Sequence, residues 1–172
     1  AGNLLGAEQS GFITDMGFET YQKILAEAME ELGFETGISS RSSGDNFVSD
    51  CTIETDQLAL IPDSYIDMTA EKIRIYKELD SLTSEKDLIN MKNRLTDRFG
   101  KMPVELERLF DIVRIRQLGQ KLGFEKIIIK NGVMIAFFIT NPLSQYYRSD
   151  RFSKVLENVN INPKLFEIKQ PD

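Results

Sequence analysis

The sequence predicts an α+β fold in which a small sheet packs against several helices. Three consecutive segments between residues 69 and 123 place apolar residues at steps of three and four, the spacing of helices with one buried face. After Gly123 the pattern changes to two β-branched and aromatic runs joined by Asn131 and Gly132, which is typical of a β-hairpin. We therefore expect a small mixed or antiparallel sheet with a hairpin, preceded by a separate N-terminal loop and helix.

The N-terminal part contains a glycine-rich loop, AGNLLGAEQSG, at residues 1–11. The segment after it repeats apolar residues at helical spacing as far as Gly33, which can end a helix. Residues 35–50 are rich in Ser, Gly and Asp and have no apolar period, which is typical of a flexible linker. We therefore predict a loop and helix over 1–34, a linker over 35–50 and the main domain over 51–172.

The main domain is expected to begin with a strand over residues 51–62, which has partial alternation and ends at Pro62. Three helices are predicted over 69–82, 83–100 and 103–123. Their ends are indicated by Thr69 as a cap, Thr83 or Ser84 as a cap, Gly100, Pro103 in a first turn, and Gly123. The hairpin strands are expected at 127–129 and 133–139, followed by a helix from Ser144 and a closing strand over 164–170.

Composition excludes most site chemistry. The chain has no histidine and a single cysteine, so it has no histidine general base, no zinc cluster of cysteines and no internal disulfide. The glycine-rich loop lacks the Gly-Lys-Ser/Thr that binds nucleotide phosphates. Catalysis by carboxylates alone stays possible, but we expect no catalytic, cofactor or metal site. The lone cysteine and the absence of an apolar run of roughly 20 residues favour a reduced, cytoplasmic compartment.

Charge is distributed unevenly along the chain. Up to Met91 acidic residues exceed basic ones by 12 (18 against 6), whereas from Lys92 basic residues exceed acidic ones by 6 (15 against 9). This asymmetry indicates either a polar interface or two solvated surfaces of different charge. Direct DNA binding is an alternative, through basic and aromatic residues that could follow a phosphate backbone or simply pack: Arg108, Arg114, Arg116, Lys121, Lys126, Tyr146, Tyr147, Arg148 and Arg151.

Two regions resemble a known family. AGNLLGAEQSG, followed by MGFETYQKILAEAM, resembles the translocation motif shared by RecG-type branch-migration helicases and transcription-repair coupling factors. The segment from Leu60 to Gly123 contains IPDSYI and the DRFG-x-x-P pattern at Asp97–Pro103, and it resembles the C-terminal domain of the coupling factors. RecG-type helicases lack that domain, so the resemblance favours the coupling factors; the alternative is a DNA-binding accessory domain of a RecG-like helicase.

The resemblance implies a parent protein that is an ATP-dependent DNA translocase, a hydrolase acting in nucleotide-excision repair of damaged DNA. It would displace RNA polymerase stalled at a lesion and recruit UvrA, with double-stranded DNA as its track and no membrane partner. ATP and Mg²⁺ would bind in the motor, with no cofactor in this fragment. The C-terminal domain would be autoinhibitory, because it packs against the N-terminal UvrB-like module and hides the surface that binds UvrA.

The resemblance also implies two groups of site residues. The DNA-translocation motif comprises Gly2, Asn3, Leu4, Leu5, Gly6, Gln9, Ser10 and Gly11, with Ala7 where the family often has Glu. The interdomain contact comprises Arg94, Asp97 and Arg98. Arg94 stands where an acidic residue is common, and Asp97 could instead cap a helix or pair with Lys101.

Overall fold

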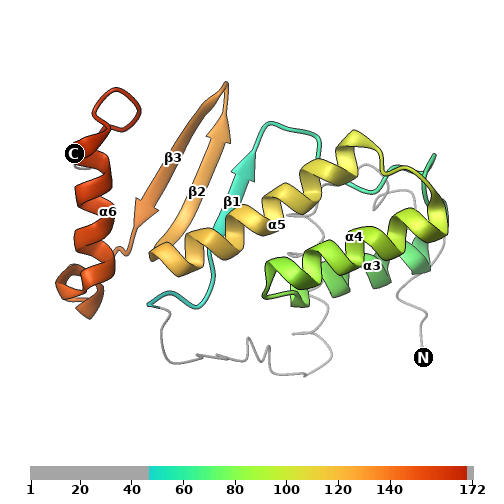
Figure 1. Cartoon of the computed structure of the whole chain (residues 1–172), viewed down its shortest axis with the longest axis horizontal. Coiled ribbons are helices and arrows are strands. Elements are labelled where there is room, and N and C mark those ends of the chain that lie inside the picture. The colour runs from blue at the N-terminus through green and yellow to red at the C-terminus, as the bar shows by residue number, and fades with distance from the viewer. Residues whose placement is uncertain (1–46, 170–172) are drawn as a thin grey trace, which may run out of the picture.

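One long helix packs on a small sheet and joins it to two further helices in the computed structural model, which describes residues 47–169 (Figure 1). The predicted N-terminal loop and helix, and most of the predicted linker, lie outside these residues. The elements are β1 (Thr52–Thr55), α3 (Thr69–Ser81), α4 (Glu85–Phe99), α5 (Val104–Leu122), β2 (Phe124–Lys130), β3 (Val133–Phe138), the 3-10 helix η1 (Gln145–Arg148) and α6 (Asp150–Ile161). The predicted α+β class is confirmed.

The sheet is mixed and has the order β1-β2-β3. Strand β1 runs parallel to β2, with Ile53 beside Ile127, and β2 runs antiparallel to β3, with Ile127 opposite Ala136. A parallel pair needs a long crossover, and here α3, α4 and α5 supply it. The antiparallel pair closes through a tight turn in which Asn131 (φ 53°) and Gly132 (φ 73°) both adopt positive φ, as a type I′ turn requires. The predicted hairpin is confirmed.

The ends of the central helices follow the sequence signals, with two exceptions. The Ser84 hydroxyl accepts a hydrogen bond from the Asp87 N–H at 3.2 Å, and Gly123 ends α5 in the left-handed conformation. Thr69, in contrast, is the first helical residue of α3, while Met68 occupies the cap position without a side-chain hydrogen bond. Pro103 likewise lies at the cap position, one residue before the first turn of α5.

The predicted first strand is too long. Strand β1 covers only Thr52–Thr55, and the later apolar residues Ala59 and Ile61 are buried against the helices instead. The Ile61 N–H donates to the Tyr76 hydroxyl at 3.0 Å, so this backbone group bonds to α3 and not to a neighbouring strand. Tertiary burial therefore accounts for an apolar pattern that the sequence alone assigns to a strand.

The C-terminal segment differs from its prediction in two places. The helix predicted from Ser144 is divided at Ser149, whose hydroxyl accepts from the Phe152 N–H at 3.3 Å and caps α6. The predicted closing strand is wrong over residues 164–169. There the Asn162 carbonyl accepts from the N–H groups of Leu165 (3.0 Å) and Phe166 (3.2 Å), which makes a turn in place of a ladder.

The core has a helical part and a sheet part, and α5 contributes to both. Leu79, Leu88, Leu106 and Leu109 are completely buried between α3, α4 and α5. On the sheet side α5 lies so close to β1 that a Cβ on Gly119 would stand 2.5 Å from the Cys51 sulfur. Helix α5 is therefore the element that joins the helical layer to the sheet, as Figure 1 shows. None of the helices within residues 47–169 is long and apolar enough to cross a bilayer.

Candidate interdomain contact surface

Helix α4 carries the three candidate interdomain residues. Arg94, Asp97 and Arg98 are all exposed in the second half of the helix, and α3 lies beside α4 (Figure 1). The eight candidate residues of the translocation motif, between Gly2 and Gly11, lie outside the described residues. The geometry of the candidate site is therefore that of α4 and its neighbour α3.

Arg98 is held by α3. Its Nη1 donates to the Glu71 Oε1 at 2.6 Å, and its guanidinium lies 4.7 Å from the centre of the Phe99 ring. Glu71 also accepts from Arg74 at 2.7 Å, and the hydrogen bond from Arg74, together with the two guanidinium charges, lowers the Glu71 pKa. Arg98 therefore serves first as a link between the two helices, with its exposed side still open to a partner.

Arg94 forms a second link to α3 through an ion pair with Glu78. The two side chains border a depression between α3 and α4 whose floor includes Leu82 and the buried Met91. Its remaining lining is polar: Asp87, Asn90 and Asn93. The charge of Arg94, at a position where the resemblance leads us to expect an acidic residue, is thus paired within the domain.

Asp97 has a different environment from the two arginines. It is exposed, and its carboxylate forms no ion pair or hydrogen bond with any residue between 47 and 169, Lys101 included. Asp97 lies nine residues after the buried Leu88, about two and a half helical turns, so it stands on the side of α4 that faces away from the core. Of the three candidates it is the one whose charge is free for a partner within the described part of the chain.

At least three of the seven basic residues of the alternative DNA-binding hypothesis pair with carboxylates among the described residues: Arg114, Arg116 and Lys126. Arg114 donates to both Glu85 oxygens at 2.8 Å and to Asp111 at 2.6 Å, and its hydrogen bond lowers the pKa of Glu85. Lys126 pairs with Glu54. Tyr146 is completely buried in an aromatic cluster, which also leaves it no free ring face for stacking on a base. These contacts do not favour a phosphate-binding stripe.

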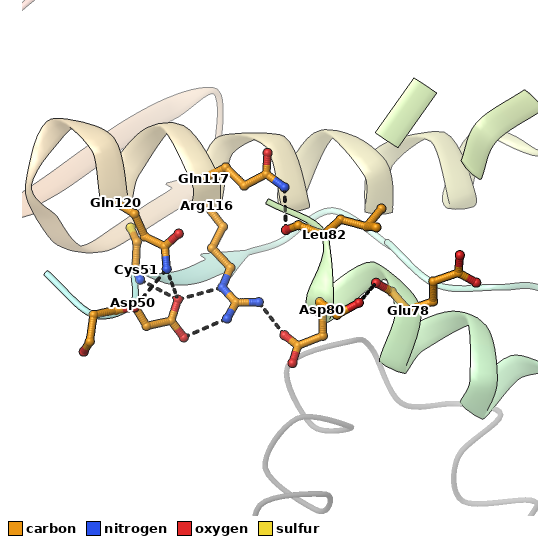
Figure 2. A network of polar contacts seen from close by, with 10 residues as sticks. Asp50, Cys51, Glu78, Asp80, Leu82, Arg116, Gln117 and Gln120 are labelled. Atoms are coloured by element: carbon orange, nitrogen blue, oxygen red, sulfur yellow. Dashed lines mark hydrogen bonds and ion pairs between the residues drawn. The ribbon is translucent and has the colours of Figure 1, made fainter. Parts of the chain in front are cut away.

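Arg116 lies in a network that joins three parts of the fold (Figure 2). It makes two hydrogen bonds to Asp50, at 2.7 and 2.9 Å, and a third to Asp80 at the end of α3, at 2.5 Å. Burial lowers the Arg116 pKa, but the hydrogen bonds and charges of the two aspartates outweigh burial and raise the pKa overall. Gln120 adds hydrogen bonds to the Ser49 carbonyl and to Asp50, both at 3.1 Å. Sequence spacing offers no signal for this network, because Asp50 and Arg116 are 66 residues apart.

Cys51, which follows Asp50 in the chain, is a buried free thiol. Burial and the neighbouring Asp50 carboxylate raise its pKa to about 11, although the Arg116 charge opposes them. The folded pKa exceeds the unfolded one, so this group contributes stability that is fully present below about pH 9 and is lost as the pH rises toward 11.

We predict that iodoacetamide at pH 8 alkylates Cys51 at least roughly tenfold more slowly in the native chain than in urea. Equal rates in a mass-spectrometric time course would contradict this burial.

Comparison with known proteins places this geometry in a family. The TRCF domain family matches residues 55–149, which is the segment from the end of β1 to Ser149. The chain belongs to the transcription-repair coupling factor family. A coupling factor of Staphylococcus epidermidis is 40% identical over 171 residues, covering 99% of this chain and 13% of that protein. One of Escherichia coli is 36% identical over 129 residues, covering 74% of this chain and 11% of that protein.

A solved structure supports the fold of this coupling-factor domain. The crystal structure of a C-terminal domain of transcription-repair coupling factor superposes with a TM-score of 0.50 at 23% identity, covering 53% of this chain and 56% of that one. The family match and the relatives above confirm the predicted family, and the chain corresponds to the C-terminal TRCF domain region of a coupling factor. It spans about 13% of the length of the Staphylococcus epidermidis coupling factor.

Proposed function

We propose that the chain is the C-terminal regulatory domain of a transcription-repair coupling factor and that it acts by docking on the N-terminal UvrB-like module of the same protein. The main support is Asp97 on α4, which faces outward and has no side-chain partner among residues 47–169. Arg94 and Arg98 stand on the flank of the same helix, tied to Glu78 and Glu71, so the surface is pre-arranged before a partner binds. Docking there would cover the UvrA-binding surface and keep the protein inhibited.

The activity of the parent belongs to the rest of the protein. We propose a cytoplasmic, ATP-dependent DNA translocase that displaces stalled RNA polymerase, with ATP and Mg²⁺ bound in the motor. The support is family membership together with the small share, about 13%, of a coupling factor that this chain covers. Residues 1–34 would form the end of the translocation motif, and residues 35–50 the linker to the regulatory domain.

A calorimetric titration tests the docking directly. The chain is titrated into the separately expressed N-terminal module of the same protein at low salt, and the titration is repeated at roughly 0.5 M salt. We expect binding that weakens with salt, because the contacting charges are exposed and screened. Absence of heat and of complex at low salt, with both pieces folded by circular dichroism, would overturn the proposal.

Reversing the charge of Asp97 should weaken this docking. We expect Asp97→Lys to raise the dissociation constant by roughly tenfold or more, since a like charge placed in a complementary interface is repelled. The matched control is Glu157→Lys, which makes the same change of net charge at an exposed position of α6. An equal loss of affinity in both variants would assign the effect to net charge. It would contradict a role for the surface on α4 that Arg94, Asp97 and Arg98 form.

A further inference from the structure

The segment Phe47–Asp50, the last four residues of the predicted linker before β1, contacts the rest of the domain along its whole length. The Phe47 ring packs edge-on against Tyr146, with centroids 5.4 Å apart, and lies under the Arg151 guanidinium. Val48 is buried in the same aromatic cluster. We call these four residues the strap.

The second half of the strap, Ser49 and Asp50, is held by hydrogen bonds. The Ser49 carbonyl accepts from Gln120, and the Asp50 carboxylate accepts from Arg116, from Gln120 and from the N–H of Cys51. Figure 2 shows these groups converging on one face of α5. Each of the four strap residues thus contacts the rest of the domain, although none of them belongs to a helix or strand.

Arg116 is shared between the strap and α3. Its Nε and Nη2 face Asp50, and its Nη1 faces Asp80 in the last turn of α3. Only 17% of the Arg116 side chain is exposed, so an arginine without a carboxylate here would be costly. When the strap leaves, Asp80 remains as a counter-ion. Displacement of the strap therefore does not leave the buried Arg116 without a carboxylate partner.

The last turn of α3 also contacts the candidate surface on α4, which comprises Arg94, Asp97 and Arg98. Glu78, two residues before Asp80, pairs with Arg94, and the Leu82 carbonyl accepts from Gln117 at 2.9 Å. A change in how Arg116 divides its hydrogen bonds between Asp50 and Asp80 would thus act on the turn that positions Arg94. The contacts form a continuous physical path from the strap to α4.

We propose that the strap and Arg116 form a latch that couples the chain entering the domain to the end of α3. With the strap seated, Arg116 is bound on both sides and the α3 turn is held. With the strap displaced by the part of the protein that precedes it, Arg116 is bound on one side and the α3 turn loosens. Only the consequence for docking rests on the proposed function; the latch itself is a property of this domain.

Reciprocity makes the latch testable without any partner. If the two sides are coupled through Arg116, loosening either one must loosen the other. In the full 172-residue chain, Asp50→Asn should speed amide hydrogen exchange at residues 79–82, and Asp80→Asn should speed exchange at residues 47–51. We expect a change of roughly tenfold in each case, the size associated with losing one charge-assisted hydrogen bond. Exchange is followed by mass spectrometry on peptides from both regions.

The matched control is Glu85→Gln. Glu85 also accepts two hydrogen bonds from an arginine of α5, Arg114, but its carboxylate forms no hydrogen bond or ion pair with the strap or with the end of α3. It should leave exchange unchanged in both regions. If Asp80→Asn speeds exchange only within α3, or Asp50→Asn only within the strap, the coupling is wrong. If Glu85→Gln has the same effect as the other two variants, the response is general destabilisation and the latch is also wrong.

Cys51 supplies a second readout that does not depend on amide exchange. It follows the strap directly and is the only cysteine of the chain. Asp80→Asn should increase its alkylation rate by roughly tenfold at constant far-ultraviolet circular dichroism, because release of the adjoining strap lets Cys51 move away from Gly119 and Ile127, which lie beside its thiol. An unchanged rate would overturn the proposal. Docking on the N-terminal module plays no part in either readout, so failure of the latch and failure of the proposed function are distinguishable.

Discussion

Alanine at Gly123 is expected to lower the free energy of unfolding by about 2–5 kcal/mol. Gly123 ends α5 at φ 83°, a conformation that costs a residue with a Cβ about 1–2 kcal/mol. A Cβ at this position would also stand 2.3 Å from the Tyr146 ring, which is completely buried. The ring cannot retreat easily, because its hydroxyl donates to the Leu122 carbonyl at 2.6 Å. The two costs therefore add.

Gly132→Ala is the matched control for this prediction. Gly132 also has positive φ, at 73°, but no atom lies within 4 Å of the place where its Cβ would be. Its variant should therefore show the conformational cost of about 1–2 kcal/mol alone. Urea unfolding followed by circular dichroism measures both variants. If Gly123→Ala lowers the free energy of unfolding no more than Gly132→Ala does, the Tyr146 ring adds no steric cost at Gly123 and the prediction is wrong.

Leu88→Ala is expected to cost about 2–5 kcal/mol, because it opens a cavity in the helical core. Leu88 is completely buried and, with Met91 and Leu95, forms the inward face of α4. The outward face of the same helix presents Asp97. Loss of this anchoring should therefore also weaken docking on the N-terminal module, in proportion to the unfolded fraction.

The neighbouring residue supplies the control for Leu88. Ile89 is 49% exposed on the same turn of α4, so Ile89→Ala removes a similar number of carbon atoms without leaving a cavity. We expect a change within about 0.5 kcal/mol. Chemical denaturation of both variants, fitted with a common slope, decides the comparison. Equal losses would show that α4 is not packed on the Leu88 side.

Local signals predict most of the central elements correctly. Ser84, Gly100 and Gly123 mark helix ends because capping depends on a side chain or a backbone angle within one turn of the chain. The Asn131-Gly132 turn is equally local, since both residues adopt the positive φ that the hairpin requires. Each of these features is decided by residues close together in the sequence, so no knowledge of the fold is needed to find them.

Predictions that depend on a distant partner are the ones that differ. Ala59 and Ile61 lie in a strand-like apolar pattern, yet they pack on helices, and the Ile61 N–H bonds to the Tyr76 hydroxyl of α3. The closing strand fails at residues 164–169 for a similar reason: a run of apolar residues forms a strand only where a ladder partner exists. Periodicity reports which side chains are apolar and leaves open which surface buries them.

The candidate surface divides in the same way. The DRFG pattern points to α4 and to Asp97 through a resemblance that is visible in the sequence. The links of Arg94 to Glu78 and of Arg98 to Glu71 are visible only once α3 lies beside α4. These links decide which charges are neutralised within the domain and which remain for a partner, and therefore which residue a docking experiment should change first.

By itself the sequence determined the family, the α+β class, the hairpin and most helix ends, because these follow from short motifs and from periodicities of a few residues. Only the tertiary structure decided the mixed sheet, the course of residues 59–61 and the sharing of Arg116 between Asp50 and Asp80. The physical reason is that charge pairing and burial act between side chains that meet in space, here 66 and 36 residues apart along the chain.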